Sequence, residues 1–154
     1  MYKKVLVPLD GSELAECVLP HVESIVKGCG VKEVIFLRVA ERMSQLCSLE
    51  GCLSQETMDS IDADNKAAAE KYLSEVTVRT RYDGVSVRPE VITGTPGESI
   101  ADYAAKNSVD LIAIATHGRS GVSRWTWGSV ADQVLHSACV AILMVRAPGC
   151  IVGI

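Results

Sequence analysis

The chain has 154 residues, 48% of them hydrophobic, with 15 basic and 19 acidic side chains. This length and composition fit one compact domain with a sizeable core. Because the net charge is −4, the basic excess with which proteins bind nucleic-acid backbones is missing, and we expect no nucleic-acid partner. The five-residue apolar run before Asp10 is too short for a signal peptide or a membrane span, which predicts a cytoplasmic protein without membrane contact.

Six cysteines are scattered along the chain without a CxxC pair. Closely spaced cysteine pairs are typical of zinc sites, and disulfides are typical of exported chains. We therefore expect reduced thiols, mostly buried, and no metal-ligating residues. The cysteines are Cys17, Cys29, Cys47, Cys52, Cys139 and Cys150.

The first third of the chain predicts a strand, a helix and a second strand. The sequence KKVLVPLD (3–10) is rich in β-branched and apolar residues, and Ser12 then offers an N-cap to a helix that Pro20 should kink. The sequence EVIFLRVA (33–40) has almost no polar interruption, which is typical of a strand covered on both faces. Residues 41–56 are predicted to form a long loop.

The middle of the chain predicts a helix over 57–80 and a third strand, VSVRPEVI (85–92). Pro89 cannot donate to a neighbouring strand, so we expect this strand at an edge of the sheet. The sequence TPGE (95–98) has a threonine at the N-cap, a proline at the first helical position and a glutamate at the third. It predicts a capping box at the start of the next helix.

The last third predicts a strand over 109–115, a glycine-rich loop, a helix over 129–138 and a fifth strand over 140–145. Strands that alternate with helices form right-handed crossovers, so the predicted fold is α/β, with one open parallel sheet and helices on both faces. Ligands of such sheets bind beyond the carboxyl ends of the strands. We therefore expect the binding site at the loops after the first, second and fourth strands.

The loop after the fourth strand has the composition of an anion site. Gly118, Gly121 and the Gly128-Ser129 pair bring unobstructed N–H groups and a hydroxyl to the start of a helix, where the helix dipole attracts phosphate. The turn after the first strand adds an acid, Asp10, at the mouth of the same site. The sequence has neither GxxxxGK[ST] nor a GxGxxG after a strand, which argues against P-loop and dinucleotide-binding proteins.

Two stretches, KKVLVPLDGSELAE and ATHGRSGVSRWTWGS, resemble the universal stress protein family. The family's nucleotide-binding pattern is a glycine, two residues, a second glycine, nine residues, a third glycine and then serine or threonine. Ala115, Gly118, Gly128 and Ser129 occupy those positions with the same spacing. Ala115 replaces the first glycine, and we expect its methyl group to be tolerated unless the backbone needs a positive φ there.

The resemblance runs over nearly the whole chain. It implies a universal stress protein domain over 1–146, followed by a C-terminal tail, 147–154. It also implies a single-domain open parallel five-stranded sheet in the order 3-2-1-4-5, which is the adenine-nucleotide alpha hydrolase-like fold.

The same resemblance implies a site for an adenine nucleotide, ATP or AMP. The end of the first strand would line the base and ribose, the backbone of Val39 would contact the adenine, and the glycine-rich loop with the following helix would receive the phosphates. A divalent ion, Mg²⁺ or Mn²⁺, would share the phosphate charge. The residues carried over to this sequence are Pro8, Leu9, Asp10, Val39, Ala115, Thr116, His117, Gly118, Arg119, Gly128, Ser129 and Val130.

No residue can be assigned as general base for an attacking water, so the sequence supports binding more firmly than turnover, and no catalytic residue is named. His117, between Thr116 and Gly118, is expected to shape the loop rather than to move a proton. The resulting hypothesis is a nucleotide-responsive regulatory protein of the stress response. Two alternatives stay open: a slow ATP hydrolase of the same fold, and a dimeric scaffold that binds no nucleotide.

The fifth strand predicts a protein partner. The side chains of residues 140–145 are apolar on both faces of the predicted strand. An apolar strand at a sheet edge promotes aggregation unless another element covers it. The resemblance implies a homodimer that pairs through this strand.

Overall fold

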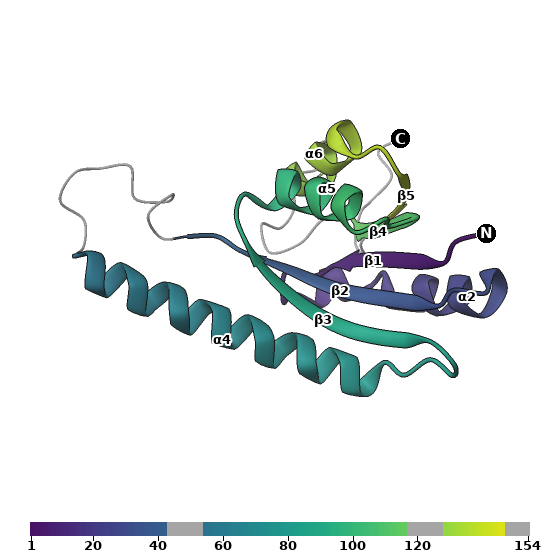
Figure 1. Ribbon diagram of the computed structural model, residues 1–154, viewed down its shortest axis with the longest axis horizontal. Coiled ribbons are helices and arrows are strands. Elements are labelled where there is room, and N and C mark those ends of the chain that lie inside the picture. Colours follow the sequence, from purple (N-terminus) through teal and green to yellow (C-terminus); the bar gives the residue numbers. More distant parts are fainter. Residues whose placement is uncertain (43–53, 117–127, 147–154) are drawn as a thin grey trace, which may run out of the picture.

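The computed structural model describes residues 1–42, 54–116 and 128–146. Within these ranges, five strands form one parallel sheet in the order β3-β2-β1-β4-β5 (Figure 1). This confirms the predicted α/β class and sheet order. The strands are β1 (Lys4–Pro8), β2 (Glu33–Ala40), β3 (Ser86–Thr93), β4 (Leu111–Ala115) and β5 (Ala141–Val145).

Helices cover both faces of the sheet and bury a separate apolar core on each. In β1, Val5 and Val7 face one core, Leu6 faces the other, and all three are fully buried. The first core is closed by α1 (Glu13–Glu16), α2 (Leu19–Cys29) and α4 (Gln55–Arg79). The second is closed by α5 (Pro96–Lys106) and α6 (Ser129–Ser137), on the opposite side of the sheet (Figure 1).

The predicted first helix is in fact two helices. Ser12 does cap α1, because its side chain accepts the N–H of Ala15, but α1 ends at Glu16 and α2 begins at Leu19. Pro20 lies in the first turn of α2. Proline lacks an N–H and clashes inside a helix, but the first turn has no partner for that N–H, so the chain starts a new helix there instead of kinking one.

Two other helices differ from the prediction, α4 in the residue at which it begins and α5 in its capping. α4 begins at Gln55 rather than at 57, because the side chain of Ser54 caps it by accepting the N–H of Thr57. Thr95 is the N-cap of α5, but its side chain makes no capping hydrogen bond, so the predicted capping box is wrong. Pro96 in the first turn carries no N–H, which leaves one donor fewer for a cap to satisfy.

The two sheet edges agree with the predictions. β3, which contains Pro89, lies at one edge, and β5 lies at the other. Along β5, Ile142 and Met144 pack on the α5 and α6 side, while Leu143 and Val145 pack on the opposite side. Of the helices that the structure describes, none has the length and apolar content needed to cross a membrane.

The expectation of mostly buried thiols is wrong for the cysteines that the structure describes. Cys17 and Cys29 are half-buried, and Cys139 is exposed. Cys139 lies two residues before β5, which is an edge strand, and the chain that leads into this strand is open to solvent there.

Candidate functional site

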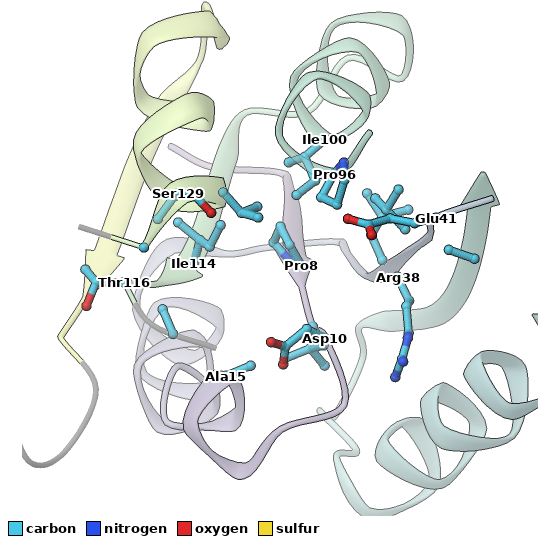
Figure 2. Close-up of a pocket in the computed structure, with 18 of the residues that line it drawn as sticks. Pro8, Asp10, Ala15, Arg38, Glu41, Pro96, Ile100, Ile114, Thr116 and Ser129 are labelled. Atoms are coloured by element: carbon cyan, nitrogen blue, oxygen red, sulfur yellow. The ribbon is translucent and has the colours of Figure 1, made fainter. Parts of the chain in front are cut away.

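A pocket of about 460 Å³ opens at the carboxyl ends of β1, β2 and β4 (Figure 2). β1 lies between β2 and β4, and the chain leaves it towards β2 on one side and returns to β4 on the other. This is the topological switch point of the sheet, where ligands of open parallel α/β sheets bind. The volume lies within the range of small-molecule sites.

The pocket brings together all the predicted site residues that fall within the described ranges. They come from three strand ends and from the start of α6, which are far apart in the sequence. His117, Gly118 and Arg119 lie outside the described residues. The residues that line the pocket as predicted are Pro8, Leu9, Asp10, Val39, Ala115, Thr116, Gly128, Ser129 and Val130.

The side of the pocket next to α5 and α6 is apolar. Pro96 and Ile100 of α5 face Pro8 of β1 across it, and Ile114 of β4 lies beside Pro8 (Figure 2). Val39 completes this side at the end of β2. Apolar side chains from opposite walls make a slot that suits a flat aromatic ring.

The side of the pocket next to α1 and α4 is polar. Asp10 comes from the turn after β1, Arg38 from β2 and Asn65 from α4. Asp10 and Arg38 both lie on the side away from Pro96 (Figure 2). A ligand in this pocket would therefore meet apolar groups on one side of the sheet and charged groups on the other.

The turn after β1 fixes the carboxylate of Asp10. Its Oδ1 accepts the backbone N–H of Ser12 at 2.9 Å and the Ser12 hydroxyl at 2.6 Å. Gly11 has a φ of +86°, which only glycine adopts without strain, and Leu9 donates its N–H to the carbonyl of Leu37 on β2 at 2.9 Å. The carboxylate is thus held in place as a hydrogen-bond acceptor at the mouth of the pocket.

The start of α6 provides donors on the opposite wall. Gly128 is the N-cap of α6 and makes no side-chain capping bond, and its own N–H donates to the carbonyl of Thr116 at 2.7 Å. This bond joins the end of β4 to the start of α6. The first N–H groups of a helix have no partner within the helix, and its dipole attracts anions. Ser129 and Val130 therefore lie where a phosphate is favoured.

Ala115 does not distort the site. It is the last residue of β4 and is 8% exposed. Among the non-glycine residues that the structure describes, Ser108 alone has a positive φ, so the backbone at Ala115 is one that any residue adopts. The methyl group in place of the family's glycine therefore costs no strain, in agreement with the expectation.

The sequence interpretation missed the wall that β2 and α4 contribute. Arg38, Glu41, Asn65 and Ala68 all line the pocket. The sequence pattern predicts the helix that becomes α4, but nothing in it indicates that one end of this helix lines a ligand site. Arg38 does carry a signal, because it is a single basic residue between apolar neighbours in a buried strand.

Comparison with known proteins identifies relatives over nearly the whole chain. The family model described as "Universal stress protein family" matches residues 1–146. The chain is similar to the universal stress protein MJ0577 of Methanocaldococcus jannaschii, with 28% identity over 156 residues, covering 95% of this chain and 96% of that protein. The solved structure of MJ0577 matches with a TM-score of 0.83 at 27% identity, covering 97% of this chain and 99% of that chain.

Two further solved structures share the fold at lower identity. One is a universal stress protein in complex with cAMP, with a TM-score of 0.68 at 19% identity over 95% of this chain and 98% of that chain. The other is a protein of the same family from Arabidopsis thaliana with AMP bound, with a TM-score of 0.63 at 16% identity over 96% of this chain and 93% of that chain. The fold is therefore the adenine-nucleotide alpha hydrolase-like fold of these proteins.

Proposed function

Since the chain belongs to the universal stress protein family, we propose that its pocket binds an adenine nucleotide, ATP or AMP. We further propose that occupancy of the pocket, rather than a chemical reaction, is the signal that the protein contributes to a stress response. A ligand that binds one conformation better than another shifts the population towards it, which is sufficient for regulation.

The adenine would lie in the apolar slot between Pro8, Pro96 and Ile100. Ring stacking against these groups excludes water from both faces of the base. The backbone of Val39, the next-to-last residue of β2, would offer its polar groups to the edge of the base. This pairing would favour adenine over guanine, because the two bases present different donors and acceptors along that edge.

The ribose would lie beside Asp10 and the phosphates at the start of α6. A carboxylate accepts hydrogen bonds from ribose hydroxyls, and the bonds from Ser12 already hold it in position. The N–H groups at Ser129 and Val130 would receive the phosphate oxygens, and a magnesium ion bound to a triphosphate would share the remaining charge.

The observation that carries the proposal is the grouping of an apolar slot, a fixed carboxylate acceptor and a helix N-terminus around one pocket. A nucleotide has an apolar base, a sugar with hydroxyls and an anionic end, in that order. The slot at Ile100, the carboxylate of Asp10 and the helix start at Ser129 offer one surface to each of these parts, with Ile100 and Ser129 on one side of Pro8 and Asp10 on the other (Figure 2). Proteins of this fold that hold cAMP and AMP are consistent with such a ligand.

We also propose that two copies of the chain pair through β5. This strand is at the sheet edge, its first residue Ala141 is exposed, and Ile142, Leu143 and Met144 are only half-buried. An apolar edge strand without a cover would aggregate, whereas pairing with a second copy satisfies its free backbone groups. Sedimentation velocity tests this, because a dimer has about twice the 16.5 kDa mass of the chain.

Isothermal titration calorimetry with ATP, AMP and GTP, each with and without magnesium, tests the nucleotide site. We expect ATP or AMP to bind with micromolar affinity and GTP to bind more weakly. Asp10→Ala should weaken binding at least about tenfold, because it removes a charged hydrogen-bond acceptor. Asp83→Ala, at an exposed turn, is the matched control and should leave binding unchanged. Absence of binding by all three nucleotides would refute the proposal in favour of a scaffold that binds no nucleotide.

A further inference from the structure

The nucleotide pose proposed above uses Asp10 on the polar side of the pocket and assigns no role to the charged side chain of Arg38 on the same side. Among the lining residues that the structure describes, Arg38 is the one basic side chain. It interrupts a strand in which its neighbours Leu37 and Val39 are apolar. Its side chain points away from Pro96, towards the α1 and α4 side of the pocket (Figure 2).

Two neighbours hold the guanidinium of Arg38 in place. Its central carbon lies 5.6 Å from the centre of the Tyr72 ring on α4, within the range of a cation–π interaction. On another side it packs against Gly11, where a Cβ atom would collide with the guanidinium. The glycine that forms the turn after β1 therefore also makes room for this arginine.

Further contacts connect Arg38 to the turn that carries Asp10. The Tyr72 hydroxyl donates to Glu16 at 2.9 Å, and the same carboxylate oxygen accepts from Arg79 at 2.6 Å. Burial, and then the bond to Glu16, raise the pKa of Tyr72 above its ordinary value of 10.0, so its hydroxyl remains a donor. Glu16 ends α1, which Ser12 begins. The contacts therefore run from the turn through α1 to Glu16, on to Tyr72 of α4 and Arg38, and back to the turn at Gly11. A side chain held in this way loses less conformational freedom when a ligand binds.

The stereochemistry of a nucleotide brings its ribose hydroxyls towards Arg38. The base and the 5′-phosphate project from one face of the ribose, and the 2′ and 3′ oxygens lie on the other. With the base at Ile100 and the phosphates at Ser129, on the α5 and α6 side, the hydroxyl edge faces Asp10 and Arg38.

We propose, as an extension of the proposed nucleotide binding, that Arg38 forms a second anion subsite that selects adenine nucleotides with an extra phosphate on the ribose 2′ or 3′ oxygen. A guanidinium presents N–H donors in a planar fork that fits phosphate oxygens, and in this pocket it lies over the face of the Tyr72 ring. By analogy, an arginine at the ribose of dinucleotide-binding folds accommodates a 2′-phosphate.

The acidic residues of the pocket make the role of Arg38 decisive. Asp10 and Glu41 also line the pocket, and Asp10 would repel a phosphate on the neighbouring ribose oxygen. Glu41 lies on the Pro96 side, farther from this edge of the ligand (Figure 2). Without the arginine, an additional phosphate at this position would therefore weaken binding.

Calorimetric titration with AMP, adenosine 2′,5′-bisphosphate and adenosine 3′,5′-bisphosphate tests the subsite and distinguishes the two oxygens. For the wild-type chain we expect one bisphosphate to bind at least about tenfold more tightly than AMP, the gain typical of a charged hydrogen bond. In Arg38→Met, the ratio of the bisphosphate affinity to the AMP affinity should fall to one or below. Arg38→Lys keeps the charge but loses the fork, so its ratio should lie between the two.

Arg81→Met is the matched control, because Arg81 is exposed and does not line the pocket. Its ratio should equal that of the wild type, and thermal melting should show all variants to be folded. If the wild type binds AMP tightly and neither bisphosphate more tightly, the inference is overturned and the proposed function stands. The same holds if the gain in affinity for a bisphosphate survives in Arg38→Met. If no adenine nucleotide binds, both the Arg38 subsite and the proposed nucleotide binding are overturned.

Discussion

One carboxylate oxygen of Asp10 accepts two hydrogen bonds from Ser12, from its backbone N–H at 2.9 Å and from its hydroxyl at 2.6 Å. The same hydroxyl accepts the N–H of Ala15 at 3.1 Å and so caps α1. One serine therefore both starts a helix and fixes the acceptor at the mouth of the pocket. This shared role makes stability and ligand affinity depend on the same side chain.

Replacing Ser12 by alanine should lower both quantities. The loss of the cap should reduce the free energy of unfolding by about 1 kcal/mol, and the freed Asp10 carboxylate should weaken AMP binding. Urea denaturation and calorimetry measure the two effects. Ser54→Ala removes the N-cap of α4 outside the pocket, so it should reduce stability and leave affinity unchanged. Equal loss of affinity in both variants would contradict a special role for Ser12.

Gly11→Ala should be more harmful than an alanine at another left-handed glycine. Both Gly11 and Gly84 have positive φ, at +86° and +72°, so alanine at either position costs about 1–2 kcal/mol in backbone strain. Only at Gly11 does the new Cβ also collide with the guanidinium of Arg38, whereas nothing lies within 4 Å at Gly84. Urea denaturation should show a larger loss for Gly11→Ala, with reduced nucleotide affinity in that variant alone. Equal losses would show that Arg38 moves away freely.

Tyr72→Phe separates the two functions that we assign to this side chain. The variant loses the hydrogen bond to Glu16, which should cost about 1 kcal/mol of stability, but it keeps the ring that holds Arg38. The selectivity for a ribose phosphate should therefore persist. Tyr82→Phe is the control, because the buried Tyr82 hydroxyl has no hydrogen-bond partner among the described residues, and its removal should be neutral or stabilising. A larger loss of stability in Tyr82→Phe than in Tyr72→Phe would be inconsistent with these contacts.

Acid should remove the contribution of Asp110. The backbone N–H groups of Lys4 and Lys3 both donate to its Oδ2 at 2.8 Å, and these bonds hold the pKa of the carboxyl below its ordinary value of 3.8. Because the folded-state pKa is the lower one, the carboxylate stabilises the fold above about pH 3.8, and this contribution is lost as the pH falls through the folded-state pKa.

Urea titrations from roughly pH 6 to roughly pH 2 measure this effect. The stability deficit of Asp110→Ala should be constant near neutral pH and shrink in acid. A deficit at Asp110 that stays constant throughout would contradict the hydrogen-bonded carboxylate.

The sheet was predictable because local signals agreed with its three-dimensional arrangement. The apolar run 34–37 of β2 is buried on both faces of the sheet, and Pro89 can be accommodated only at an edge. The division of the first helix was not predictable in the same way. Proline permits either a kink or a new helix start, and tertiary packing decides between them.

The site was predictable where strand ends supply it and not where a distant helix does. Parallel strands bring their carboxyl ends to one edge, so Asp10, Val39 and Thr116 meet there through topology alone. Asn65 and Ala68 reach the pocket from α4, a helix that packs on β2 and β3. Which of its residues reach a pocket depends on how the whole helix packs on the sheet, and no local sequence pattern encodes that packing.

The most direct test of the nucleotide site is a titration of the amide NMR signals of ¹⁵N-labelled protein with ATP. We predict saturable shifts at Asp10, Val39 and Val130, which line the three parts of the pocket, and no shift at Val87, far from it on β3. Shifts confined to residues outside the pocket, or no shifts at saturating ATP, would contradict the assignment of this pocket as a nucleotide site.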